Sequence, residues 1–319
     1  MSSSAESYLK VSYDLRPAKQ VERRIFIDAF QGLAQAGFQI SDYQYTGFGS
    51  IYFVDFILFH KFLGITKMLS IERDYKIKKR VYFNRPYKTV DIRMDLAKKV
   101  IPTLSSRTKH ILWLDYDQII DEEKLYEVIL ASGHLSSGSI ILVTLDASPP
   151  GTERDEMYGI SEWKKYYSSV AENYLGGFSD EADFKLTNLC RVNVGIIHNA
   201  IKSALVHRAG VKFVPMFNFL YADGRHPMVT CGGMIASSSD EEKLKESDLR
   251  NKPYYMADFS KPPFEIRVPK VTRKERLYLD SNMPCQRSWR AEKFNFSAKD
   301  IAEYRKIYRY IPAYAEMML

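Results

Sequence analysis

The sequence contains few cysteines and no long hydrophobic run. Its cysteines, Cys190, Cys231 and Cys285, are widely spaced and odd in number, so they form neither a disulfide framework nor a C-x-x-C metal site. The longest apolar runs, such as 51–59, carry a charge and are far shorter than a membrane span. The first 25 residues lack the apolar stretch of a secretory signal. We therefore expect a cytoplasmic protein with reduced thiols and no membrane contact.

Several familiar catalytic signatures are also missing. The sequence has no Walker loop, no zinc motif and no Ser-His-Asp arrangement. Asp115, Asp117 and Asp121 are close in sequence, and carboxylates suit a divalent cation. Their spacing is not diagnostic, so we predict no metal site.

Positive charge is concentrated in one segment. The chain has 319 residues, 45% hydrophobic and 27% charged, which is typical of a globular protein with an adequate core. Most of its net charge of +7 comes from residues 267–293, where eight basic residues outnumber three acidic ones. Basic patches attract polyanions, so the predicted partner of this segment is a nucleic acid. A solvated surface is the alternative, and the sequence leaves the oligomeric state open.

Helices and strands are expected to alternate in the first half of the chain. Apolar residues spaced by three and four predict a helix over 19–36, and further helices are expected over 51–63 and 121–131, the last with Gly133 as its C′ residue. Short apolar runs predict five strands, at Tyr43–Thr46, Lys67–Ile71, Thr89–Ile92, His110–Asp115 and Ser139–Leu145. This alternation predicts a doubly wound, mainly parallel α/β sheet.

A hairpin is expected to complete this sheet. Strand formers fill Val211–Tyr221 and Met228–Ala236, and the Asp-Gly turn between them predicts antiparallel pairing. Residues 237–252 are charged and serine-rich, which predicts a surface loop. His226, in the expected turn, is either a general base or a plain loop residue.

The chain accordingly divides into three predicted parts. These are an N-terminal helical segment (1–39), the sheet domain (40–236, with a helical insertion near 151–190) and an extension (237–319). The extension is expected to contain a linker, a basic extended segment and a C-terminal helix over 299–310 that packs on the domain.

The strongest motif is a glycine turn followed by an acidic strand end. Asp42-Tyr-Gln-Tyr-Thr-Gly-Phe-Gly-Ser50 precedes a helix, and Leu69-Ser-Ile-Glu-Arg-Asp74 follows it. Strand, glycine turn, helix, strand and carboxylate is the layout with which an α/β sheet holds an adenosine-containing cofactor. Gly47 and Gly49 would let the backbone approach the ligand, and Glu72 would accept hydrogen bonds from ribose hydroxyls. The alternatives are an ordinary tight turn and a surface ion pair.

This layout resembles the S-adenosylmethionine-dependent methyltransferases of the Rossmann-like class I, over roughly residues 40–236. Poorly characterised bacterial proteins labelled as O-methyltransferases carry similar G-x-G-S and W-L-D-Y-D signatures. The resemblance implies seven strands, with an antiparallel seventh strand beside the fifth. It also implies cofactor-binding residues Thr46, Gly47, Phe48, Gly49, Ser50, Glu72, Arg73, Asp95 and Asp115, and catalytic residues Asp115, Tyr116 and Asp117. Of these, Asp95 would contact the adenine amine or merely cap a helix.

The sequence departs from the pattern of this class at three places. Tyr45 stands where the class has an acid two residues before Gly47, and Ser50 follows Gly49 without a third glycine. After Asp115 there is no N/D-P-P-Y, which disfavours methylation of a base amine.

Two hypotheses follow. The leading one is an enzyme that methylates an oxygen or nitrogen nucleophile of a nucleic acid or small molecule, with Asp115 as a candidate base. The alternative is a catalytically inactive methyltransferase-like module that senses a ligand or binds a protein, for example in a bacterial defence system. A nicotinamide-dependent oxidoreductase is disfavoured because Tyr52 stands where its third glycine would be.

Overall fold

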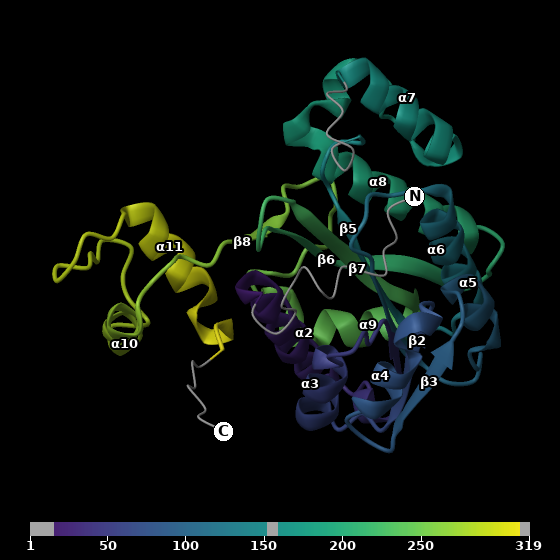
Figure 1. Cartoon of the computed structure of the whole chain (residues 1–319), viewed down its shortest axis with the longest axis horizontal. Helices are drawn as coiled ribbons and strands as arrows, with labels where there is room; N and C mark the ends of the chain where they lie inside the picture. Colours follow the sequence, from purple (N-terminus) through teal and green to yellow (C-terminus); the bar gives the residue numbers. More distant parts are fainter. Residues whose placement is uncertain (1–15, 152–158, 313–319) are drawn as a thin grey trace.

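The protein is built around one eight-stranded sheet (Figure 1). The computed structural model describes residues 16–151 and 159–312. The strand order is β3-β2-β1-β4-β5-β7-β6-β8. The strands are β1 (Gln44–Gly47), β2 (Lys67–Glu72), β3 (Val90–Met94), β4 (His110–Asp115), β5 (Ile140–Asp146), β6 (Val211–Tyr221), β7 (Met228–Ser237) and β8 (Phe264–Ile266). All five predicted strands and both hairpin strands are confirmed within one or two residues.

Strand directions also agree with the prediction. β1 to β5 are parallel, whereas β7 is antiparallel to both β5 and β6. The predicted mainly parallel seven-stranded sheet, with its antiparallel seventh strand beside the fifth, is therefore confirmed. β8 is an addition that pairs parallel with the end of β6.

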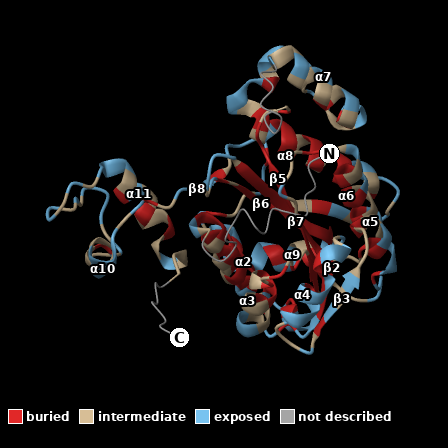
Figure 2. Cartoon of the chain, viewed as in Figure 1, coloured by how far each residue is buried: buried red, intermediate tan, exposed pale blue. Residues whose placement is uncertain are grey.

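Helices cover both faces of the sheet because its strands are apolar on both sides. In β4, Ile111 and Trp113 belong to one hydrophobic cluster, and Leu112 and Leu114 belong to the other. The buried residues accordingly follow the sheet and the inner sides of the helices (Figure 2). The first cluster contains α2 (Pro17–Gln35), α3 (Val54–Leu63), α4 (Lys78–Phe83) and α9 (Ser238–Glu246); the second contains α5 (Ala97–Val100), α6 (Glu122–His134), α7 (Ile160–Ala171) and α8 (Leu189–Leu205).

A C-terminal extension follows β8. It contains α10 (Arg273–Ser281), α11 (Ala298–Ile307) and the 3-10 turn η11 (Tyr308–Tyr310). Figure 1 shows α10 and α11 beyond the edge of the sheet, with the end of the extension returning beside α2. Asp28 of α2 anchors this return, because it accepts hydrogen bonds from Tyr310 Oη at 3.2 Å and Tyr254 Oη at 2.5 Å.

Three local predictions are wrong. Residues 237–252 are not a loop, because Ser237 and Asp240 form a capping box and buried Leu244 fixes α9 on the sheet. The segment 267–293 is not extended throughout, since Thr272 caps α10. Gly133 lies inside α6, which continues one residue further because His134 is held by a hydrogen bond to the Leu104 carbonyl.

A helix that crosses a bilayer needs about 20 predominantly apolar residues. No helix in 16–151 or 159–312 is both long and apolar enough to cross a membrane.

Candidate functional site

The carboxyl ends of the parallel strands bring the predicted site residues to one edge of the sheet. Gly47 ends β1, Glu72 ends β2 and Asp115 ends β4. β1 lies between β2 and β4, and Gly47 is in register with Ser70 on one side and Trp113 on the other. The strand order reverses at β1, and ligands of such sheets bind in the crevice at that point.

The glycine turn after β1 has no room for a side chain at its second glycine. The Gly49 amide donates to Ser70 Oγ at 3.2 Å, and its carbonyl accepts from the Phe53 amide at 2.8 Å. A Cβ atom on Gly49 would lie 2.5 Å from Ser70 Oγ and 2.7 Å from the Phe53 ring. Ser50 and Phe53 both adopt a φ of 50°. This left-handed conformation is rare for residues other than glycine, and such residues are concentrated at functional sites.

Replacement of Gly49 by alanine is therefore expected to lower the free energy of unfolding by about 1–3 kcal/mol, because the new methyl group overpacks the turn. Urea denaturation measures this change. Gly133→Ala is the control, because no atom of the described residues lies within 4 Å of where its Cβ atom would be, and alanine favours the helix that surrounds it. A loss at Gly49 no larger than that at Gly133 would contradict the steric account.

Glu72 places a partly buried carboxyl group at this edge. Its Oε1 atom accepts the Asp74 amide hydrogen at 2.8 Å. Burial raises the pKa of Glu72, although the amide groups of Asp74 and Arg73 act in the opposite direction. A partly desolvated carboxylate at a strand end is a suitable acceptor for paired hydroxyl groups.

Asp95 and Arg73 lie further out. Asp95 accepts the amide hydrogen of Leu96 at 2.8 Å, which lowers its pKa, and lies 3.4 Å from Lys99 Nζ. The alternative role of Asp95 as a helix cap is not seen, because the N-cap residue of α5 is Leu96 and the described residues provide no side-chain cap for this helix. Arg73 is exposed. The contact of either residue with a cofactor stays a prediction.

Asp115 takes part in a buried charge cluster that the sequence analysis missed. Its Oδ1 atom lies 2.7 Å from Lys19 Nζ of α2, which also lies 2.8 Å from Glu22 Oε2. Lys19 Nζ donates to Tyr221 Oη at 3.1 Å and lies 4.3 Å from the centre of the Trp113 ring. The side chains of Lys19 and Glu22 are 0% exposed. The available signal was the presence of two charges on the apolar side of the predicted first helix.

This cluster keeps Asp115 ionised. Burial by itself would raise the pKa of Asp115, but the charge and hydrogen bond of Lys19 outweigh it, so the pKa lies below its usual value. Burial raises the pKa of Glu22, and Lys19 compensates only in part. A carboxylate with a lowered pKa is a weak proton acceptor at neutral pH, so Asp115 is better suited to electrostatic positioning than to general base catalysis.

A second pair of titratable residues lies at the end of β5, the strand that neighbours β4. The Oδ2 atom of Asp146, at the end of β5, lies 3.1 Å from Nδ1 of His226 in the β6–β7 turn. The Asp146 amide donates to the carbonyl of Gln118, three residues after Asp115, at 3.0 Å. The side chain of Asp146 is 5% exposed and that of His226 is 54% exposed, so the carboxylate orients an imidazole that solvent or a substrate can reach. The sequence identified His226 as a candidate but not its partner.

Tyr116 and Asp117 lie on the loop after β4. The Tyr116 hydroxyl donates to Glu127 Oε2 at 2.5 Å, and its ring centre lies 5.4 Å from that of Phe48 in the glycine turn. Tyr116 therefore supports the turn, while Asp117 is exposed. A catalytic role for either residue stays a prediction.

A carboxylate lies near Tyr45, the position at which the sequence lacks the acid that precedes the glycine turn. The hydroxyl of Tyr45 donates to Asp55 of α3, which is buried. This hydroxyl is adjacent to Gly47, because a Cβ atom on Gly47 would lie 2.6 Å from it. Burial raises the pKa of Asp55, and the positive charge of Arg23 is the strongest opposing influence.

Arg23 itself is an incompletely satisfied buried cation. It is 3% exposed, and its Nε and Nη1 atoms have no hydrogen-bond partner within 16–151 and 159–312. Such donors are costly in the absence of an acceptor. The site thus contains the hydrogen-bonded pair of Tyr45 and Asp55 beside Gly47, and the buried guanidinium group of Arg23 on the same side of the sheet. In the same described ranges, no three His, Cys, Asp or Glu side chains are arranged to hold a metal ion.

Comparisons with known proteins give one extensive sequence match. A model of the family described as "Putative O-methyltransferase" matches residues 11–319. No curated protein matches the chain. Similar solved structures include the O-methyltransferase from Bacillus cereus in complex with SAH, at 10% identity and a TM-score of 0.38, covering 72% of this chain and 87% of that one.

Two other similar structures come from Pyrococcus horikoshii and Methanococcus jannaschii. Trm1 from Pyrococcus horikoshii with S-adenosyl-L-methionine has 11% identity and a TM-score of 0.42, covering 72% of this chain and 58% of that one. The Methanococcus jannaschii fibrillarin pre-rRNA processing protein has 9% identity and a TM-score of 0.35, covering 63% and 69%. Likeness at this level supports no assignment of a substrate.

Proposed function

Because the chain belongs to the family described as "Putative O-methyltransferase" and is a methyltransferase of the Rossmann-like class, we propose that it transfers a methyl group from S-adenosylmethionine to an oxygen or nitrogen atom of a small molecule or nucleic acid. One observation carries this proposal: the glycine turn, Glu72 and Asp115 end three adjacent strands at the point where the strand order reverses.

The residues at this edge fit the cofactor. Glu72 suits the ribose hydroxyls, because its carboxyl group at the end of β2 can accept hydrogen bonds from them. The unsatisfied Nε and Nη1 donors of Arg23 suit the carboxylate of the methionine part, and Asp55 suits its ammonium group. When bound, S-adenosylmethionine supplies a methyl group on a positively charged sulfur atom.

His226 is the proposed general base. Its Nδ1 atom faces Asp146, so its Nε2 atom is left to take the proton from a hydroxyl or amine acceptor. Asp146 stabilises the imidazolium that this transfer produces. Asp115, held ionised by Lys19, contributes a fixed negative charge. This assignment moves the proton-accepting role from Asp115 to His226.

The base assignment predicts a selective loss of turnover. His226→Gln is expected to lower the rate of methyl transfer by about 10²–10⁴-fold, since general base catalysis contributes that much. Transfer is measured with S-adenosylmethionine labelled in its methyl group and a panel of phenols, aliphatic alcohols, amines and RNA. Affinity for S-adenosylhomocysteine, measured by calorimetry, should stay unchanged.

His207→Gln is the matched control, because His207 is an exposed histidine beyond the end of α8. It should transfer methyl groups at the parent rate. Parent activity in His226→Gln would exclude it as the base, and label transfer to no acceptor would favour the alternative of an inactive binding module.

A further inference from the structure

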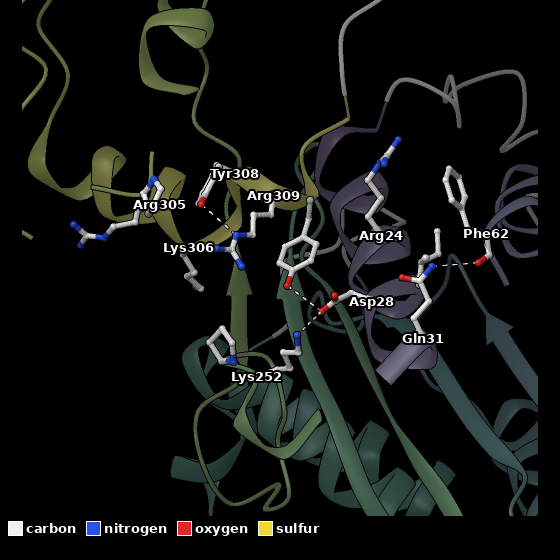
Figure 3. A pocket seen from close by; sticks show the side chains of 13 residues that line it. Arg24, Asp28, Gln31, Phe62, Lys252, Arg305, Lys306, Tyr308 and Arg309 are labelled. Carbon is white, nitrogen blue, oxygen red and sulfur yellow. Dashed lines mark hydrogen bonds and ion pairs between the residues drawn. The ribbon is translucent and has the colours of Figure 1, made fainter. Parts of the chain in front are cut away.

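A cavity lies between α2 and the C-terminal extension. It has a volume of about 530 Å³, and none of its lining residues belongs to the site at the strand ends. Arg24, Asp28 and Gln31 line it from α2 (Figure 3). Their spacing of four and three residues places them on one helix face, whereas Lys19, Glu22 and Arg23 lie on the side that faces the sheet. We call this cavity the α2 groove.

The α2 groove has a large surplus of positive charge. Its cations come from three distant parts of the chain, and Figure 3 shows Arg24 on one side with the extension's cations on the other. These cations are Arg24, Lys252, Arg305, Lys306 and Arg309, and Asp28 is the one acidic residue among the described residues that line the groove. Lys252 pairs with Asp248 as well as Asp28, and Lys306 pairs with Glu303. The positive charge that attracts anions is therefore that of Arg24, Arg305 and Arg309, for which the described residues provide no ion pair.

Asp28, the acidic residue of the groove, already has hydrogen-bond and ion-pair partners within the protein. Asp28 accepts hydrogen bonds from two tyrosine hydroxyls and lies 3.7 Å from Lys252 Nζ. Arg24, by contrast, has a buried Nε atom without a hydrogen-bond partner in the part of the chain that the structure describes. Arg309 directs its Nε–H to the neighbouring Tyr308 hydroxyl at 3.2 Å. Its two terminal nitrogens remain as further donors for an anion.

Aromatic rings accompany these cations. Phe62 is 47% exposed, and Tyr308 and Tyr310 are half-buried in the same groove. Cations that contact phosphates, combined with rings on which bases stack, are the features of sites that bind single nucleic-acid strands. An acidic peptide would use the cations but would leave the rings unused.

We propose that the α2 groove binds a nucleotide unit, with its phosphate on the cations of the groove and its base on the exposed ring of Phe62 or the neighbouring tyrosines. The volume lies within the range of about 300–1,000 Å³ that is typical of ligand sites. The nucleotide belongs either to a nucleic-acid strand or to a free mononucleotide, which share this chemistry.

This proposal differs from the prediction that the basic segment 267–293 contacts nucleic acid. Several cations of that segment serve other purposes: Arg276 donates to the carbonyls of Pro312 and Ile311, and Arg267 pairs with Asp300. Of the segment, only Pro284 lines the α2 groove. The two surfaces can therefore be tested against each other.

Fluorescence anisotropy of the full chain with a labelled single-stranded uridine oligonucleotide tests the proposal. Arg24→Gln combined with Arg309→Gln is expected to raise the dissociation constant by about tenfold or more. The dependence of log Kd on log salt should become shallower by about 1.4, at about 0.7 for each lost phosphate contact on a single strand. Arg273→Gln combined with Lys274→Gln removes the same charge from the exposed face of α10 and should leave binding unchanged.

The outcomes are distinct. Competition by adenosine monophosphate at concentrations near those of the oligonucleotide would identify a free nucleotide as the ligand, and weak competition would identify a strand. Equal weakening in both double variants, or binding of neither probe, would overturn the proposal. If the groove variant does not fold, Phe62→Ala replaces it in the same comparison, because this ring is half exposed. No methyl donor is present, so failure here leaves the methyl-transfer proposal intact.

Discussion

Replacement of Lys19 by methionine is expected to lower the free energy of unfolding by about 3–5 kcal/mol, the typical cost of breaking a buried ion pair. The ammonium group of Lys19 lies 2.7 Å from Asp115 and 2.8 Å from Glu22. Methionine is apolar and about as long as the stem of lysine, so it preserves the packing but removes the cation that both carboxylates contact. Urea denaturation measures the loss.

Lys212→Met is the matched control, because Lys212 also lies 2.8 Å from a carboxylate, that of Glu241, but is 65% exposed. Exposed pairs contribute about 0–1 kcal/mol, so this variant should be nearly as stable as the parent. A double variant with Lys19→Met and Glu22→Leu should regain part of the loss, since it removes one unpaired carboxylate. If Lys19→Met were no less stable than Lys212→Met, the buried charge cluster would not stabilise the fold.

The loss in Lys19→Met is expected to depend on pH. Burial already raises the folded-state pKa of Glu22 above the ordinary value of 4.5, and removal of the cation raises it further. A carboxyl group with a raised folded-state pKa binds more protons in the folded state, so its contribution to stability falls as pH rises from 4.5 through that pKa. The variant should therefore be less destabilised at pH 5 than at pH 8.

Replacement of Glu72 by alanine is expected to weaken binding of S-adenosylhomocysteine by about tenfold to a few hundredfold, because each charge-assisted hydrogen bond contributes about 1.5–3 kcal/mol. Folding should change little, since burial makes the ionised form of Glu72 unfavourable in the free protein. Calorimetry measures the affinity. Glu265→Ala removes an exposed carboxylate from β8, away from the site, and should bind as the parent does.

The sheet could be predicted from sequence because its signals are local. Continuous apolar runs mark the buried parallel strands, and the hairpin from 211 to 237 is defined by two strand-forming runs and one turn. α9 was missed because composition suggested a loop. The capping box of Ser237 and Asp240, together with buried Leu244, decided the structure instead.

The site could be predicted only where its residues end adjacent parallel strands of the sheet. Gly47, Glu72 and Asp115 follow from strand order, since all parallel strands end at one edge. Lys19 is 96 residues from its partner Asp115, and no spacing rule connects them. The same applies to Asp146 and His226, which meet because β7 inserts next to β5.

The acid that the glycine motif lacks shows that a side chain from another element can take the place of a motif residue. Tyr45 reads as a departure from the pattern, but its hydroxyl is bonded to buried Asp55 from the following helix. A carboxylate is therefore present beside Gly47, contributed by another element. Only the contact between strand and helix makes this apparent.

The central claim is that the edge formed by β1, β2 and β4 is a pocket for S-adenosylmethionine. Calorimetric titration of the full chain with S-adenosylmethionine, S-adenosylhomocysteine and NAD tests it most directly. The account predicts dissociation constants in the micromolar range or below for the first two ligands and no binding of NAD. Binding of NAD in preference to the other two, or the absence of binding by all three, would contradict it.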